Sequence, residues 1–359
     1  MSHFVDLTSA DVVLRPPDVV AAAVAALLAR PSGYTPPGGN PALREDVARH
    51  LTERGPRPVT GEETVLTAGA TGAFAALVLA RVPAGGTVLV PDPALPLYAR
   101  TIRTLGRHVE RYPVPTSAGD ARWAEVIAAH APRCSALLWN TPHNPTGRVF
   151  TAPQNRTAAE LADQYGLFML SDEVFHDLVW HGTHVSPLRW ADPERSAGIW
   201  SASKALRLSG LRIGWLAASR ETAALAAHAS WELTMSAPVP GQVALGMSLR
   251  CYDAVVAASR AQISRNLPVL AAAFPPRWVT PVQAGTCLWV ELKGTDMTDT
   301  QAARHLLAEC GARVWPGSRF GPLGTGHLRL NAGAATADVE RVAGLIGRVL
   351  STSTGRTRS

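Results

Sequence analysis

The chain has 359 residues, of which 47% are hydrophobic and 17% are charged, and this balance excludes wholesale disorder. The length exceeds that of one simple core and predicts a large domain with a smaller one. The formal net charge of +6 comes from dispersed arginines rather than from a basic patch, so we expect no nucleic-acid partner.

Apolar runs and helical patterns alternate between residues 63 and 219. Most of the runs are short and continuous, which is typical of strands buried on both faces of a sheet. They predict strands at 63–69, 86–92, 107–114, 135–142, 166–173, 197–204 and 212–219. Helical patterns at 70–81 and 152–165 indicate crossover connections. We therefore predict a large α/β domain over 31–255, built on a mostly parallel seven-stranded sheet that helices cover.

The pattern changes after residue 255. A long helical stretch is followed by strand-like runs at 278–293 and 327–334 and by helices at 298–310 and 336–350. This order predicts a smaller α+β domain over 256–350, which residues 1–30 join. The polar end of the chain, 351–359, is expected to be a disordered tail.

The four cysteines are scattered and form no CxxC pair. They indicate reduced thiols of a cytoplasmic protein rather than a disulfide framework or a zinc site. The chain shows no leader-like segment, and its early apolar run at 19–29 is too short to span a bilayer. We therefore expect a soluble cytoplasmic protein that has no membrane partner.

Lysine is almost absent from the chain. Of its 34 basic residues only Lys204 and Lys293 are lysines, and the rest are arginines. Lysine can act as an amine nucleophile once it is desolvated, whereas arginine cannot. Lys293 fits a surface position at the end of a strand-like run. For Lys204, in SASKALRLSG, a surface position and a chemical role stay open on the local sequence alone.

Polar side chains follow several of the predicted strands, and the carboxyl ends of parallel strands meet at one edge of a sheet. We expect that edge to gather Thr71, Asn144, Asp172, Ser201, Ser203 and Lys204.

Five motifs in order along the chain resemble the fold-type-I enzymes that depend on pyridoxal 5′-phosphate, in particular the class I and II aminotransferases. They are YTPPGGNPALR (34–44), TAGATGA (67–73), NTPHNPTGRVF (140–150), SDEVFHDLVW (171–180) and SASKALRLSGLRIG (201–214). The resemblance implies an aminotransferase that binds pyridoxal 5′-phosphate and acts on an α-amino acid. The reaction would run through a Schiff base on Lys204 and an α-carbanion (quinonoid) intermediate, with a 2-oxo acid as the second substrate.

The same resemblance implies roles for further residues. Asp172 would pair with the cofactor's ring nitrogen, and Asn144 with its ring oxygen. The phosphate would be held at a helix start by Gly69, Ala70 and Thr71, and by Ser201, Ser203 and Arg212.

The resemblance also places residues around the substrate and the partner subunit. Arg329 would grip the α-carboxylate with its guanidinium, and Ala10 would lie in the substrate-binding segment. Tyr34 would reach the phosphate of a neighbouring subunit, which implies a homodimer.

Two positions depart from the family pattern. Leu95 stands where an aromatic ring usually stacks on the cofactor, and Phe175 stands where a tyrosine usually donates a hydroxyl. Tyr98 is a candidate for the missing stacking ring. Together with likeness to the carbon–sulfur β-lyase branch, these changes leave β- or γ-elimination or replacement as an alternative reaction. A non-catalytic cofactor-binding regulator is a weaker alternative, because Lys204, Asp172 and Arg329 are all retained.

Two smaller hypotheses concern the substrate pocket and metals. Asp11 lies in the segment that shapes the pocket in this family, so it is a candidate to face a cationic substrate tail. His176, His181 and His184 follow a predicted strand at spacings that match no standard ligand pattern, so we predict no metal site.

Overall fold

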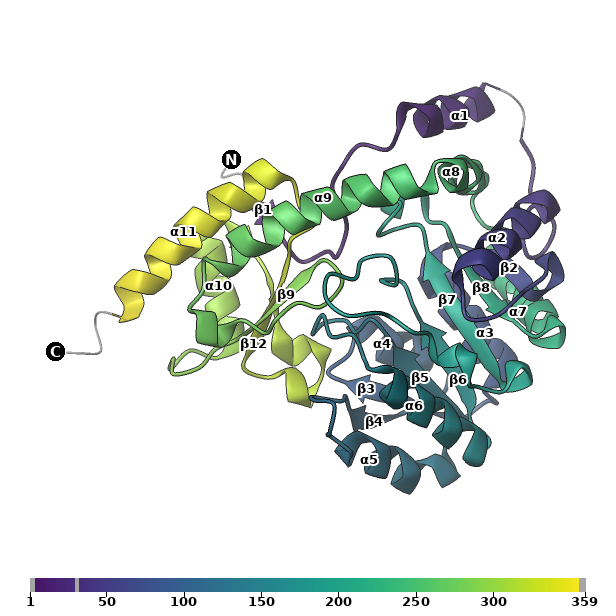
Figure 1. Cartoon of the computed structure of the whole chain (residues 1–359), viewed down its shortest axis with the longest axis horizontal. Coiled ribbons are helices and arrows are strands. Elements are labelled where there is room, and N and C mark those ends of the chain that lie inside the picture. The colour runs from purple at the N-terminus through teal and green to yellow at the C-terminus, as the bar shows by residue number, and fades with distance from the viewer. Residues whose placement is uncertain (1–3, 30–31, 355–359) are drawn as a thin grey trace.

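A seven-stranded sheet forms the centre of the larger part of the molecule in the computed structural model, which describes residues 4–29 and 32–354 (Figure 1). β8 runs antiparallel to both of its neighbours, and the other paired strands run parallel. The predicted mostly parallel sheet is thereby confirmed. In spatial order its strands are β2 (Thr64–Thr67), β8 (Gly214–Ala218), β7 (Ser196–Ser201), β6 (Phe168–Asp172), β5 (Ala136–Asn140), β3 (Thr87–Asp92) and β4 (His108–Pro113).

Successive side chains of each strand point to opposite faces of this sheet, so both faces carry apolar residues. Helices cover both faces. Leu138 and Leu170 pack into the core under α3, α4 and α7, whereas Leu137 and Met169 pack under α5 and α6. The covering helices are α3 (Gly69–Arg81), α4 (Pro96–Thr104), α5 (Arg122–His130), α6 (Ala152–Gln164) and α7 (Arg220–Thr234), and α2 (Pro41–Arg54) lies beside β2.

A second, smaller sheet is built from the later part of the chain. In it β12 (His327–Asn331) pairs antiparallel with β9 (Cys287–Glu291) and β11 (Trp315–Pro316). A short parallel pair joins β1 (Val5–Asp6) to β10 (Ala312–Arg313). The helices of this part are α9 (Tyr252–Ala271), α10 (Asp299–Cys310) and α11 (Thr336–Thr354). Its apolar core is continuous with residues of α2 and α8 (Val239–Arg250).

Two of the predicted segments, 1–30 and 351–359, contain helical residues. Residues 1–30 were assigned as a whole to the smaller domain, but α1 (Asp18–Leu28) packs against α8, where its Val20 is buried (Figure 1). From the described part of this segment, β1 pairs with β10 in a separate two-stranded sheet of the later part of the chain. α11 continues to Thr354, into the segment 351–359 that was predicted to be a disordered tail. Residues 355–359 lie outside the described part.

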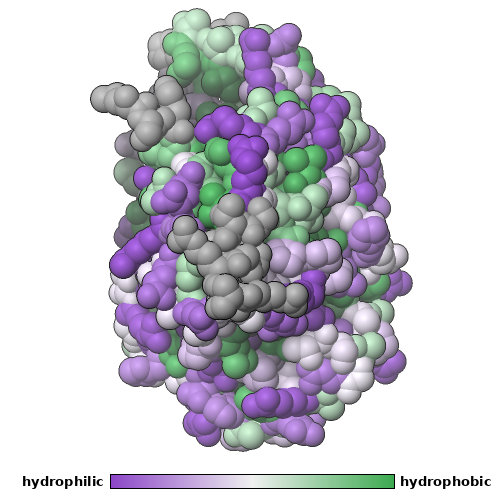
Figure 2. Space-filling view, turned by 90° about the vertical axis from the view of Figure 1, so that its left-hand side faces the viewer, coloured by the Kyte–Doolittle hydropathy of each residue, from purple (hydrophilic) through white to green (hydrophobic). Residues whose placement is uncertain are grey.

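Seen from the side of α11, hydrophilic residues are interspersed with small groups of hydrophobic ones (Figure 2). All four cysteines are free thiols, and two of them are buried. Across residues 4–29 and 32–354, no helix combines the length and the apolarity of a membrane span.

Candidate active site

The carboxyl ends of the central strands open into a cavity of about 300 Å³ between the two parts of the molecule. Every predicted site residue except Gly69 and Tyr34 lines it. Those that do are Ala10, Ala70, Thr71, Leu95, Asn144, Asp172, Phe175, Ser201, Ser203, Lys204, Arg212 and Arg329. Gly69 lies directly behind Arg212, and Tyr34 is an exposed residue elsewhere on the surface.

The register of the sheet brings these side chains together. Asn140 at the end of β5 lies opposite Asp172 at the end of β6, and Asp172 in turn pairs with Ile199 of β7. Parallel strands end at the same edge, so the polar residues that follow them share one rim. The small sheet closes the other side of the cavity with Arg329 of β12.

The two lysines have different surroundings. Lys204 lies in the turn after β7 with a side chain that is 19% exposed, and its Nζ donates to Asp11 Oδ1 at 2.9 Å. Lys293 is a surface residue whose side chain is 51% exposed and pairs with Glu291. The setting of Lys204, inside the cavity beside a carboxylate, supports the chemical role that the local sequence left open.

Asp172 is a buried carboxylate with two hydrogen-bond donors. The Tyr98 hydroxyl donates to Oδ2 at 2.7 Å, and the Val174 backbone N–H donates to Oδ1 at 3.1 Å. Burial raises the pKa of Asp172, while these two hydrogen bonds and the charge of Lys204 act in the opposite direction. The Tyr98 contact is absent from the sequence interpretation, which considered this residue only as a stacking ring.

One end of the cavity is built to hold an anion. The first backbone N–H groups of α3 have no partner within the helix, and Ala70 and Thr71 of this turn line the cavity. Ser201 and Ser203 share a 2.8 Å hydrogen bond beside them. Arg212 adds a guanidinium, which the Ser209 carbonyl oxygen steadies at 3.0 Å. Helix dipole, hydroxyls and guanidinium together favour a phosphate group.

This anion site depends on a close approach between β8 and α3. A Cβ atom at Gly214 would lie 2.6 Å from the Gly69 carbonyl carbon and 2.7 Å from the Ala70 nitrogen, which no side chain tolerates. Gly69 itself has φ +73° and leaves no room for a side chain beside Arg212. Glycine at these two positions therefore allows the start of α3 to lie close to β8 and to Arg212.

We expect Gly214→Ala to weaken cofactor binding, because its methyl group displaces the backbone that carries the Ala70 N–H. Loss of one charge-assisted hydrogen bond corresponds to an increase of about 10- to 100-fold in the Kd for the cofactor. Fluorescence titration of the cofactor-free protein measures this Kd, and Gly246→Ala is the control, since a Cβ there meets only Leu43 at 3.5 Å. An unchanged Kd for Gly214→Ala would contradict the assignment of the anion site.

Arg329 is held flat at the opposite side of the cavity. Its Nη1 donates to Asn144 Oδ1 at 2.9 Å, its Nη2 donates to the Thr8 carbonyl oxygen, and its guanidinium lies over the Phe320 ring. Its buried Nε has no hydrogen-bond partner among the described residues. A fixed guanidinium with a free donor suits a carboxylate that enters the cavity.

The two departures from the family pattern both lie at the cavity. Leu95 is half-buried and Phe175 is buried, and both line the cavity. Neither can donate a hydrogen bond from its side chain. The Tyr98 ring meets Phe74 edge to face at 5.3 Å, and its hydroxyl is engaged by Asp172.

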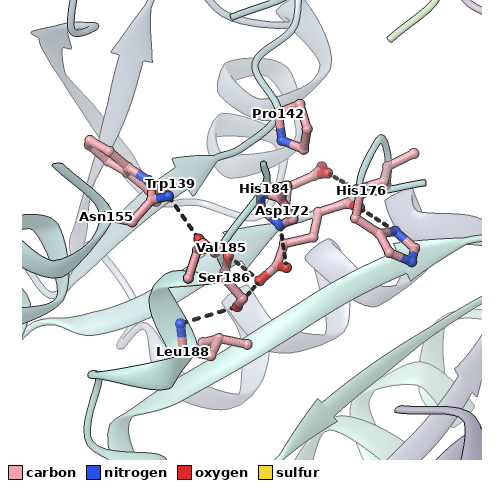
Figure 3. A network of polar contacts seen from close by, with 12 residues as sticks. Trp139, Pro142, Asn155, Asp172, His176, His184, Val185, Ser186 and Leu188 are labelled. Atoms are coloured by element: carbon pink, nitrogen blue, oxygen red, sulfur yellow. Dashed lines mark hydrogen bonds and ion pairs between the residues drawn. The ribbon is translucent and has the colours of Figure 1, made fainter. Parts of the chain in front are cut away.

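A buried network behind the cavity fixes the end of β6. Glu173 accepts hydrogen bonds from Ser171 Oγ at 2.8 Å, Ser186 Oγ at 2.5 Å and His184 Nε2 at 2.9 Å. Figure 3 shows His184 and Ser186 converging close to Asp172. The segment that carries them is thereby tied to the strand end that positions Asp172.

Two of the three histidines considered as metal ligands contact carboxylates, and the third lies in an exposed turn. His184 contacts Glu173, and His176 lies 3.3 Å from an Asp177 carboxylate oxygen. His181 lies in an exposed turn. Among the described residues, no group of three or more histidine, cysteine, aspartate or glutamate side chains is placed to hold a metal ion.

These features fit pyridoxal 5′-phosphate together with an amino acid. The anion site suits the phosphate, the buried Asp172 carboxylate suits a protonated ring nitrogen, and the Lys204 amine suits an aldehyde carbon. The free Nε–H of Arg329 remains for a substrate carboxylate.

Comparison with known proteins gives the same family across the chain. The family described as aminotransferase class I and II matches residues 2–346. An arginine–pyruvate transaminase of Pseudomonas aeruginosa is 32% identical over 88% of this chain and 81% of its own length. An aspartate/prephenate aminotransferase of Thermus thermophilus is 30% identical over 93% of this chain and 88% of its own length.

Solved structures share the whole arrangement. Aspartate aminotransferase from Thermus thermophilus with maleate has a TM-score of 0.88 at 28% identity, covering 97% of this chain and 92% of that one. N-succinyldiaminopimelate aminotransferase from Mycobacterium tuberculosis has a TM-score of 0.89 at 27% identity, covering 96% of this chain and 93% of that one.

Proposed function

The chain belongs to the class I and II aminotransferases, which use pyridoxal 5′-phosphate, and on this premise we propose the role of each residue in its cavity. The observation that carries the proposal is the convergence of Lys204, Asp172 and Arg329 in one cavity. When bound, pyridoxal 5′-phosphate stores the amino group of an amino acid and passes it to a 2-oxo acid.

Lys204 Nζ is the amine that would hold the aldehyde end of the cofactor, and as a free amine it would move the proton at the substrate Cα. Asp172 stabilises a proton on the ring nitrogen, and its burial strengthens that interaction. Ala70, Thr71, Ser201, Ser203 and Arg212 hold the phosphate, and Gly69 leaves room for Arg212.

Three further residues position the substrate. Arg329 binds the α-carboxylate, and its contact with Asn144 fixes the amide that faces the cofactor's ring oxygen. The backbone of Ala10 forms the cavity wall beside the substrate. The Thr286 hydroxyl holds it in place by donating to the Ala10 carbonyl oxygen at 3.2 Å. Leu95 and Phe175 pack against the cofactor ring as apolar contacts.

We also propose that the enzyme works as a homodimer in which Tyr34 reaches the phosphate in the partner's cavity. Tyr34 is 72% exposed and does not line its own cavity. Large hydrophobic side chains on and beside α1 are exposed as well, among them Val13 at 56% and Leu28 at 72%. Exposed apolar side chains of this kind favour burial against another chain.

If Tyr34 donates to the partner's phosphate, Tyr34→Phe raises the Kd for the cofactor by about tenfold, the loss of one charge-assisted hydrogen bond. Titration of the cofactor-free protein measures this, and light scattering shows the dimer for both proteins. Tyr165→Phe, at the end of α6, is the control. A monomer that binds the cofactor as tightly as the wild type would rule out the shared site.

We propose a cytoplasmic location for this enzyme. The four free cysteines support it, because thiols persist in a reducing compartment. The two-part division into a larger sheet domain and a smaller one is likewise our proposal, with the boundary inside α9 and with α1 assigned to the larger part.

A single-turnover experiment tests the proposed reaction. Cofactor-loaded protein is mixed with one amino acid at a time, without any 2-oxo acid. Release of the matching 2-oxo acid in an amount equal to the enzyme, without ammonia, is the expected result. Repeated release of ammonia or a thiol would instead show elimination, and Leu95 and Phe175 would then become the residues to explain.

A further inference from the structure

We propose that Asp11 selects amino acids whose side chain carries a positive charge, an inference that rests on the proposed function of this cavity. The charged residues that line the cavity are Asp11, Arg100, Asp172, Lys204, Arg212 and Arg329. Asp172 is buried under the Tyr98 hydroxyl and faces the cofactor. Among the described lining residues, Asp11 is therefore the carboxylate that remains for the substrate, and its side chain is 33% exposed.

The Asp11 backbone is fixed by the small sheet. Its carbonyl oxygen accepts a hydrogen bond from Asn331 Nδ2 at 2.8 Å, and a Cβ at Gly333 would lie only 2.2 Å from that oxygen. Val13 N–H donates to the Gly333 carbonyl oxygen at 2.7 Å. The segment is thus pressed against β12 and the turn after it, so the carboxylate is presented from a preorganised backbone.

The ion pair of Asp11 cannot persist through the reaction. Its partner is Lys204 Nζ at 2.9 Å, and a lysine that takes a proton from the substrate must first be uncharged. During that step Asp11 is a partly desolvated carboxylate that lacks a cation, which is unfavourable. A cationic group on the substrate restores the pairing, whereas an acidic side chain adds repulsion.

The neighbouring walls suit the stem of such a side chain. Trp315 and Phe320 line the same cavity, and their apolar ring atoms can pack against a chain of methylene groups. Arg100 also lines it, but as an exposed residue on α4. A preference for acidic amino acids would therefore point to Arg100 instead of Asp11, and the test below separates the two.

The test compares amino acids that differ in the charge of the side chain, with citrulline and norleucine as the uncharged counterparts closest in shape to arginine and lysine. Wild type and Asp11→Asn are assayed with arginine against citrulline, and with lysine against norleucine and glutamate. We expect wild type to favour arginine over citrulline, and lysine over norleucine and glutamate, in kcat/KM by about 10- to 100-fold, and Asp11→Asn to lose those ratios. Asp18→Asn, an exposed residue of α1 paired with Arg15, is the control and keeps the wild-type ratio.

A binding measurement reads the same contact without turnover. Calorimetry compares 4-guanidinobutyrate with the uncharged 4-ureidobutyrate, and the guanidinium ligand should lose its advantage in Asp11→Asn. An equal loss for all amino acids would place Asp11 at the shared α-amino group, and a wild-type preference for glutamate would favour Arg100; either result overturns the proposal. If no amino acid yields a 2-oxo acid, the proposed function fails, while the calorimetric ratio still tests Asp11 separately.

Discussion

Replacing Lys204 by alanine is expected to lower kcat by about 10²- to 10⁴-fold, the usual contribution of a positioned acid–base group. The same change should abolish the visible absorbance of lysine-bound cofactor, because no amine remains to bond with its aldehyde. Both effects follow from a single lysine inside the cavity. Stopped-flow assays and absorbance spectra of the loaded protein measure them.

The chain supplies a matched control for this experiment. Lys293 is its other lysine and lies at the surface in an ion pair with Glu291, so Lys293→Ala should keep both activity and absorbance. An absorbance that survives in Lys204→Ala and disappears in Lys293→Ala would reverse the assignment.

Replacing Asp172 by asparagine is expected to lower kcat by about 100- to 1000-fold, the cost of losing one preorganised electrostatic group. Asparagine keeps the size of the side chain but not the charge that holds a proton on the ring nitrogen. The effect should be large because Asp172 is buried and little water is left to screen its charge.

Tyr98→Phe is the informative comparison for this variant. It removes the hydroxyl that donates to Asp172 and leaves the carboxylate in place, so its loss in kcat should be smaller. Pre-steady-state assays of the two variants against the same amino acid rank them. An Asp172→Asn enzyme as active as the wild type would remove the residue from the proposed chemistry.

Local sequence was sufficient to predict the large sheet. Its strands are short apolar runs that are buried on both faces, as in SALLWN, which becomes β5. Polar residues directly after such strands meet at one edge, so the sequence alone predicts that Asp172 and Lys204 share one site. The family motifs supplied the roles of these residues.

Contacts between distant segments could not be predicted in this way. The Tyr98–Asp172 hydrogen bond joins residues 74 positions apart, and the Lys204–Asp11 pair joins residues 193 positions apart. No periodicity encodes such pairs, because they depend on how two separately formed elements pack. The same reason explains α1, whose alanine-rich sequence does not indicate that its Val20 is buried against α8.

The cofactor attachment itself gives the most direct measurement. Borohydride treatment fixes the cofactor to the amine that holds it, and peptide mass spectrometry then locates the modified residue. We predict modification in the peptide that carries Lys204, with no modification of Lys293. Modification at Lys293 or at the chain's amino terminus, or none at all in cofactor-loaded protein, would contradict the assignment of this cavity as the active site.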